Sequence, residues 1–404
     1  MMYQKEDALR NKTEESSPLA GVRVLEFGHF AAGPFATMLL ADWGADVVKV
    51  EPPEGEPMRH WPPLVGASET NLGLSMNFAI LNRNKRCVGI DLKDPKGLEQ
   101  ARALCREADI VLENFRPGVL ESLGLGYDDV VKLNPTIVYC SVTGYGQTSP
   151  ARDRGAFDVA IQAVSGVMSV TGEENGPPVK CGVALADYGT GVYAALSCVT
   201  ALRRAERTGK PGRVDVSMYS CMLSLANLQT SEYWGSGVLP KRLGSRHPKA
   251  APYQAYLGAD GKWFILAAGS DRLWHRVCDV LEAPELATDP RFKTAGARAE
   301  NQVELEEVLS EILSKSSASV WLEKFDAAQV PAAPINDYAE ALSSDHVQAT
   351  NLVHKMKLPD GAEVPTVGNP VALSDYEFRI FHDPAQSGAH TAEVLADWTG
   401  RGRA

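Results

Sequence analysis

The sequence has few of the features that mark exported, membrane-spanning or nucleic-acid-binding proteins. No apolar run reaches the roughly 18 residues expected of a transmembrane helix. Residues 1–17 lack both the apolar core of a signal peptide and the acid-poor composition of a transit peptide. There is no dense basic run and the formal net charge is −11, whereas nucleic-acid phosphates are bound mainly by Lys and Arg. We therefore expect a soluble, cytoplasmic protein with a disordered tail over residues 1–17, and neither a membrane nor a nucleic acid as partner.

Several catalytic motifs are also missing. The seven cysteines are dispersed without a CxxC pair, which is typical of reduced cytoplasmic thiols. No HExxH motif or Cys/His ligand spacing is present, so we expect no metal site. The GxSxG nucleophile elbow of the α/β-hydrolases is also absent, so we do not expect a hydrolase of that kind. Residues 28–33 have the glycine spacing of a P-loop but lack its Lys-Ser/Thr, and Gly144 and Gly146 lack the third glycine of a dinucleotide fingerprint. The sequence therefore supports neither nucleotide triphosphate hydrolysis nor hydride transfer.

Apolar β runs alternate with helical stretches through the first half of the chain. We expect strands at residues 22–27, 46–51, 86–92, 110–115, 136–142 and 213–218. Such alternation predicts an α/β fold with a mostly parallel, doubly wound sheet. Composition divides the chain into a large domain (18–225), a smaller α+β domain with a hairpin turning at 259–262 (226–329), and a linker and return segment (330–404) that opens with the proline-rich stretch 330–334.

Asp187 is the strongest candidate for chemistry. The apolar residues 183–186 lead to this carboxylate at the start of a long Ala/Leu/Val helix, which is a preferred position for an N-cap. Gly189 and Gly191 weaken the first turns by roughly 1 kcal/mol each, which suggests that something approaches the backbone there. The positive helix end keeps a carboxylate ionised and nucleophilic. Residue patterning alone leaves both roles open, cap and nucleophile.

Ligands of parallel α/β sheets bind in the loops at the carboxyl ends of the strands. Four such loops contain glycine or charged residues suited to ligand contact. They are residues 28–33, 93–94, 113–118 and 143–147.

Stretches along nearly the whole chain resemble the class III CoA-transferases, the family of formyl-CoA transferase and carnitine CoA-transferase, which also contains α-methylacyl-CoA racemase. The resemblance extends from about Pro18 to Thr391. It is carried by residues 18–25, 29–34, 40–51, 84–86, 113–115, 144–148, 246–248, 251–253 and 330–331.

The resemblance implies a Rossmann-like large domain, a small domain, and two chains interlocked as a homodimer. It also implies that Asp187 attacks an acyl-CoA donor to form a mixed anhydride, from which CoA passes to a free carboxylic acid acceptor. Coenzyme A thioesters are then substrates, and no cofactor is bound permanently. The CoA contacts carried over from the family are His29, Ala31, Ala32, Ile90, Asp91, Leu92, Lys93, Asn114, Phe115, Arg116, Val142, Thr143, Gly144 and Tyr145.

The chain departs from the formyl enzyme at two basic positions. Pro52 and Ser122 replace them, so Arg59, Lys85 or Arg86 would have to supply the missing charge, while Lys93 and Arg116 are expected to meet phosphates. The glycine-rich loop of the formyl enzyme has no counterpart, which argues against formate and oxalate as substrates. We expect a small, dicarboxylic acid instead.

Two other hypotheses remain, a racemase-type isomerase and a non-catalytic CoA-binding protein. In the racemases, the corresponding segment is similar to Arg-Ala-Gly-His-Asp. This chain has Arg-Gly-Ala-Phe-Asp there, at residues 154–158. Phe157 cannot transfer a proton as His does, and on a helix Asp158 points about 100° away from it. The sequence therefore favours the transferase.

Overall fold

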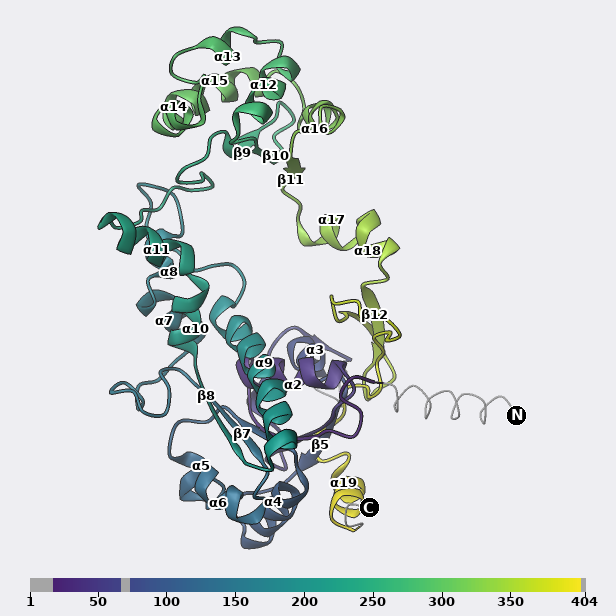
Figure 1. The fold of residues 1–404 in the computed structure, drawn as a ribbon. Helices are drawn as coiled ribbons and strands as arrows, with labels where there is room; N and C mark the ends of the chain where they lie inside the picture. Colours follow the sequence, from purple (N-terminus) through teal and green to yellow (C-terminus); the bar gives the residue numbers. More distant parts are fainter. Residues whose placement is uncertain (1–16, 67–72, 401–404) are drawn as a thin grey trace. The chain divides into compact units, whose positions relative to one another are not determined.

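The computed structural model describes residues 17–66 and 73–400 (Figure 1). The chain forms two compact units: unit 1 holds the described residues up to Val167, then Lys180–Trp234 and the residues from Gln348 onward, and unit 2 holds Met168–Val179 and Gly235–Val347. The predicted disordered tail lies outside the described residues, apart from Ser17. Among the helices that are described, none combines the length and apolar character needed to cross a bilayer.

Unit 1 is built on a six-stranded sheet in which every neighbouring pair is parallel. The strand order is β5 (Lys85–Gly89), β2 (Asp46–Glu51), β1 (Arg23–Phe27), β6 (Ile110–Glu113), β7 (Val138–Thr143) and β8 (Gly212–Ser217). The order reverses between β1 and β6, which is where ligands bind in open parallel sheets. The predicted α/β fold with a mostly parallel sheet is confirmed.

Helices cover both faces of this sheet, so its strands are apolar runs. Val24 faces the core formed with α2 (Ala32–Asp42) and α9 (Leu185–Thr208), whereas Leu25 faces the core that contains α4 (Pro95–Glu107), α6 (Tyr127–Leu133) and α19 (Thr391–Thr399). Helix α9 ends at Thr208, because Gly209 follows it with φ +63° and stops the helix.

The return segment completes the edge of the sheet at β5. The guanidinium of Arg86 pairs with Asp46 of the neighbouring strand and with Glu393 and Asp397 of α19. The indole N–H of Trp398 also donates to Asp46 Oδ2 at 2.8 Å. Residues more than 300 positions apart therefore form one ionic cluster.

Shorter elements complete unit 1. They are η1 (Pro57–His60), β3 (Leu64–Val65), β4 (Leu74–Ser75), α3 (Met76–Leu81), α5 (Val119–Ser122), α7 (Asp158–Val164), α10 (Met218–Leu225), β12 (Val353–Lys357) and β13 (Glu363–Val367). Three helices span the boundaries between the units: α8 (Val167–Val170), α11 (Asn227–Ser236) and α18 (Asp345–Ala349).

Unit 2 contains the predicted hairpin. Strands β9 (Tyr253–Leu257) and β10 (Trp263–Ala267) are antiparallel, and Gly261 turns the chain between them with φ +74°. β11 (Ala332–Pro334) pairs with β10 as the outer strand, so the proline-rich stretch expected to be a linker is instead part of this sheet. The helices of this unit are α12 (Asp271–Val280), α13 (Glu285–Thr288), α14 (Ala295–Glu300), α15 (Gln302–Leu313), α16 (Ala318–Ala327) and α17 (Tyr338–Leu342).

Candidate active site

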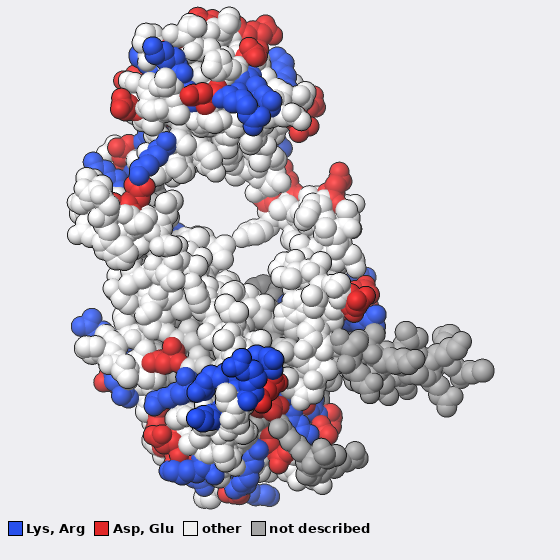
Figure 2. Space-filling view, viewed as in Figure 1, with Lys and Arg blue, Asp and Glu red and all other residues white. Residues whose placement is uncertain are grey.

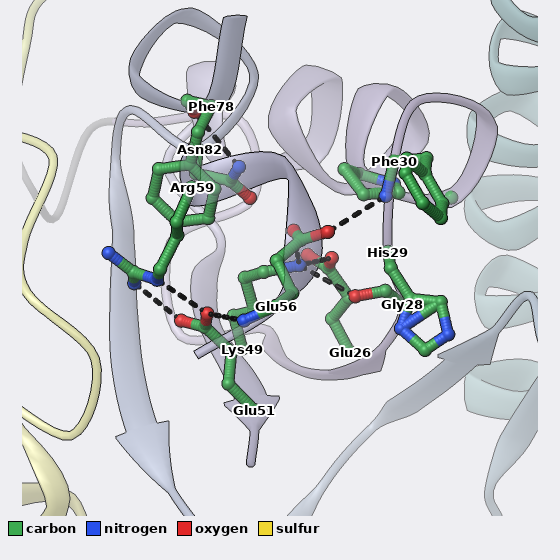
Figure 3. Close-up of polar contacts among 12 residues, drawn as sticks. Glu26, Gly28, His29, Phe30, Lys49, Glu51, Glu56, Arg59, Phe78 and Asn82 are labelled. Atoms are coloured by element: carbon green, nitrogen blue, oxygen red, sulfur yellow. Dashed lines mark hydrogen bonds and ion pairs between the residues drawn. The ribbon is translucent and has the colours of Figure 1, made fainter. Parts of the chain in front are cut away.

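The loop that follows β1 is held by side chains from two other segments. His29 N–H donates to Asn114 Oδ1 at 3.0 Å, and Asn114 Nδ2 donates to His29 carbonyl oxygen at 2.9 Å. Phe30 N–H donates to Glu56 Oε2 at 2.9 Å (Figure 3). Phe30 has φ +62°, a left-handed conformation that costs a bulky residue about 1–3 kcal/mol. These bonds therefore fix a loop shape that the chain would not adopt alone.

Buried charges support this loop (Figure 3). Lys49 Nζ donates to Gly28 carbonyl oxygen at 2.7 Å and to Glu26 Oε1 at 2.8 Å, and forms an ion pair with Glu56 Oε1 at 2.9 Å. Lys85 Nζ donates to Glu26 Oε2 at 2.9 Å. Burial alone would raise the pKa of Glu26, but the two ammonium groups outweigh it and lower the pKa to about 2. The loop thus rests on side chains that are all paired.

Basic residues that were expected to replace the missing CoA-phosphate contacts are used inside the protein. Arg59 donates to both carboxylate oxygens of Glu51, from Nε at 2.7 Å and from Nη2 at 2.6 Å. Lys85 is bound to Glu26, and Arg86 to the ionic cluster around Asp46. All of these cations are buried. None of them is free for an anionic ligand.

The loops after β1, β6 and β7 line one cavity of about 330 Å³ together with the start of α9. Gly144 brings the segment before α7 onto the end of β7, because a Cβ at Gly144 would lie only 2.1 Å from the Cβ of Ala156. The cavity brings together ten of the predicted site residues: His29, Ala31, Ala32, Asn114, Phe115, Arg116, Val142, Thr143, Gly144 and Asp187. It lies at the carboxyl edge of the sheet, beside the point where the strand order reverses.

The remaining predicted contacts do not line this cavity. Ile90 is 2% exposed and belongs to the core under α4. The residues after it, Asp91, Leu92 and Lys93, follow the edge strand β5. Asp91 Oδ1 accepts from Lys93 N–H at 2.9 Å, which forms a local turn. The ring of Tyr145 lies 6.1 Å from that of Tyr219, in a small core with Met218.

Asp187 occupies the third position of α9 and not the N-cap, which is Ala184. The cap is supplied from another helix: Asp158 Oδ1, at the start of α7, accepts from Ala186 N–H at 2.8 Å and from Asp187 N–H at 3.4 Å. Of the two roles that the sequence left open for Asp187, the structure therefore does not support the cap. Within the described residues its carboxylate has no hydrogen-bond or ion-pair partner. Its side chain is therefore free for a ligand.

The surroundings of Asp187 make it less acidic than a surface carboxylate. Burial in the cavity, together with the negative charge of Asp158, raises its pKa to about 7. At neutral pH both forms are present in comparable amounts. A partly desolvated carboxylate without bound donors is a stronger nucleophile when it is ionised.

The glycines after Asp187 serve helix packing. A Cβ at Gly191 would lie 2.8 Å from the Phe35 ring and 3.0 Å from the Ala32 carbonyl oxygen of α2. A Cβ at Gly189 would lie 2.7 Å from Leu225 of α10. The expected close approach to the backbone is made here by neighbouring helices, α2 and α10, and not by a substrate.

Among the charged side chains that line the cavity, sequence reasoning missed three: Arg152, Arg154 and, in its role as the cap of α9, Asp158. In the sequence, these residues stand out only by lying between the loop after β7 and the start of a helix. Many polar residues occupy such positions without any functional role. Phe157 also lines the cavity and is 72% exposed.

Comparisons with known proteins identify the family. Residues 19–391 match CoA-transferase family III. The chain is 38% identical to the succinate–glutarate CoA-transferase of Agrobacterium fabrum, covering 94% of this chain and 95% of that one. It is 37% identical to human succinyl-CoA:glutarate CoA-transferase, covering 94% and 86%. A crystal structure of a CAIB/BAIF family protein from Brucella suis superposes with a TM-score of 0.85 at 36% identity, covering 95% and 99%. The chain therefore belongs to CoA-transferase family III, a family of enzymes.

Proposed function

We propose that this protein transfers CoA from an acyl-CoA donor to a small dicarboxylic acid, and that Asp187 is the nucleophile. The observation that carries the proposal is the unpartnered carboxylate of Asp187 in a cavity at the carboxyl edge of the sheet. The names of the two glutarate CoA-transferases support a dicarboxylic substrate.

The proposed reaction passes through covalent intermediates on Asp187. Its carboxylate attacks the thioester carbonyl and the C–S bond breaks. CoA departs as the thiolate, and the donor acyl group remains on Asp187 as a mixed anhydride. The thiolate then attacks the Asp187 carbonyl carbon and releases the donor acid as its carboxylate. The acceptor carboxylate attacks the resulting aspartyl thioester, the C–S bond breaks with release of CoA thiolate, and a second anhydride forms. The CoA thiolate attacks the acceptor carbonyl of that anhydride, which yields the new acyl-CoA and restores the Asp187 carboxylate.

The loop after β1 is suited to hold the reacting end of the thioester. Its backbone is fixed by Asn114 and Glu56, so its small residues Ala31 and Ala32 present a rigid wall to the cavity. A rigid wall that excludes water protects an anhydride from hydrolysis.

A screen of free acids tests the function. Purified protein is incubated with succinyl-CoA or acetyl-CoA and single mono- or dicarboxylic acids, and acyl-CoA products are identified by mass spectrometry. We expect new acyl-CoA thioesters with dicarboxylic acids. Formation of free CoA alone, or of no product with any acid, would contradict the proposal.

The charge of Asp158 is expected to set the pH range of the reaction. Since ionised Asp187 attacks, kcat/KM should rise with pH through about 7, the pKa of this group. Asp158→Asn removes a neighbouring negative charge but keeps an oxygen that can accept from Ala186 N–H, so the pKa of Asp187 should fall. Because burial is the larger cause, we expect the acidic limb to move down by up to about one pH unit.

The measurement is the kcat/KM profile of wild type and Asp158→Asn between about pH 5 and 9. Thermal unfolding of the variant at each pH serves as the control for a loss of the cap. An unmoved limb, or one shifted to higher pH, would show that Asp158 does not act on Asp187 through its charge.

We also propose that a second copy of the chain covers the apolar face of α9. Val192 and Leu196 are 52% and 63% exposed and line an apolar groove of about 660 Å³ with Met38 of α2. In Figure 2 the surface over α9 has few charged side chains before its last turns. Exposed, contiguous apolar faces of this kind mark protein interfaces. Sedimentation at nanomolar concentration is expected to give a dimer, and an active monomer would contradict this.

A further inference from the structure

Two arginines at the cavity have no acidic partner. Arg116 follows β6 and Arg154 precedes α7, and both side chains are exposed at the cavity. Neither forms an ion pair within the described part of the chain, although acidic residues outnumber basic ones, 51 to 40, in the whole sequence. A Cβ at Gly155 would lie 3.6 Å from Arg116 Nη2, so the Arg116 guanidinium lies against the residue next to Arg154. Unpaired arginines from two segments therefore line the same cavity.

These arginines share a cavity with Asp187 without touching it. They line the same cavity of about 330 Å³ as Asp187. Within the described residues no hydrogen bond or ion pair joins them to the Asp187 carboxylate, and no cation lowers the pKa of that group. Room for a small ligand is therefore left between the carboxylate and the cations.

A dicarboxylic acid carries two groups that could meet Asp187 and an arginine at the same time. The two carboxyl carbons of succinate or glutarate are roughly 4–5 Å apart, from ordinary C–C bond lengths. A guanidinium binds a carboxylate through parallel N–H···O bonds, which a Lys or a neutral side chain does not reproduce.

The phosphates of CoA are the competing anions. With the thioester at Asp187, an extended pantetheine arm places the pyrophosphate roughly 15 Å away, whereas both arginines line the same cavity as Asp187. We infer that Arg154, with Arg116 beside it, binds the non-reacting carboxylate of a dicarboxylic substrate while the reacting carboxyl group lies at Asp187. This inference rests on the proposed function and adds a residue that selects the acid.

Paired acids that differ only in the second carboxylate test the inference. Glutarate and valerate have the same number of carbons, and each is used as acceptor with wild type, Arg154→Gln and Arg154→Lys. With acetyl-CoA as the donor, which has no second carboxylate, we expect Arg154→Gln to raise the KM for glutarate roughly ten- to a hundredfold, with smaller changes in kcat, in the KM for acetyl-CoA and in the use of valerate. Arg154→Lys should recover part of the loss.

Arg203→Gln is the matched control, because it removes an exposed guanidinium paired with Glu206 on α9, away from the cavity. Calorimetry with glutarate and valerate, without CoA, gives a second readout: wild type should prefer glutarate and Arg154→Gln should not.

The results separate the two hypotheses. An unchanged KM and unchanged binding of glutarate in Arg154→Gln would overturn the inference. So would an equal loss with valerate, or an equal rise in the KM for acetyl-CoA, and the latter would place Arg154 at a CoA phosphate. Failure of the wild type to form a new thioester with any acid in the screen would instead overturn the proposed function, while the glutarate preference in calorimetry still tests Arg154.

Discussion

Asp187→Asn and Asp187→Ala are expected to lose CoA transfer by roughly a thousandfold or more and to unfold as the wild type does. Removing a covalent nucleophile closes the proposed route, and losses of this size are typical of such variants. The fold should tolerate the change because the cap of α9 comes from Asp158, whose bonds go to the backbone of Ala186 and Asp187. Transfer is measured as the initial rate of new acyl-CoA formation, and stability by thermal unfolding.

Trapping locates the intermediate. Wild type incubated with an acyl-CoA and hydroxylamine should be modified at Asp187, as seen by peptide mass spectrometry, and Asp187→Asn should not be. Asp128→Asn is a suitable control, because it removes an exposed carboxylate from the first turn of another helix, α6. Retention of most of the activity by Asp187→Ala would refute the assignment of the nucleophile.

We expect exchange of the α-hydrogen of a 2-methylacyl-CoA to be much slower than CoA transfer. This comparison separates a transferase from an isomerase of the same fold. Racemisation needs a proton-transfer group on each face of the enolate, and one such group is worth roughly 10²–10⁴ in rate. Phe157 offers none, and both oxygens of Asp158 are occupied: Oδ1 accepts from Ala186 N–H, and Oδ2 from Gln162 Nε2 at 2.7 Å. Incubation of a 2-methylacyl-CoA in deuterated water should therefore give uptake at least about a hundredfold slower than CoA transfer.

His29 is the residue to examine if uptake is fast. Its imidazole lines the cavity with Asp187 and lies edge-on against Phe115, with ring centroids 4.4 Å apart. Burial lowers the pKa of His29, so the neutral ring is available as a base. Rapid deuterium uptake without an acceptor acid, abolished by His29→Gln, would make isomerisation the better description of the activity.

The sheet could be predicted from the sequence because its strands are buried on both faces, and such strands are continuous apolar runs. The same apolar runs also contain charged residues, from which a buried ionic cluster could have been predicted. Glu26 and Lys49 stand inside apolar strands, and a charge in such a position requires a buried partner. The sequence could have indicated that charges lie beneath the loop after β1, but not which residues pair.

Other features of the candidate site have no signature in residue spacing. Asp158 caps a helix that begins 27 positions later, on amides 28 and 29 positions away, and no local pattern connects a carboxylate to so distant a helix. Gly189 and Gly191 have the same appearance in a sequence whether a ligand or a helix approaches them. Only the positions of α2 and α10 decide between these explanations.

The division of unit 1 has a consequence for synthesis of the chain on the ribosome. The edge strand β5 is made early, but Cys87 N–H donates to His390 Nδ1 and Gly89 N–H donates to Thr391 Oγ1, both at 3.0 Å. Residues 235–347, which form most of unit 2, are made in between. About 300 residues separate β5 from His390 and Thr391, so at about 5–20 residues per second the edge of β5 stays uncovered for roughly 15 to 60 s. An open strand edge pairs readily with other chains, so the nascent protein passes through a period in which chaperone binding would protect it.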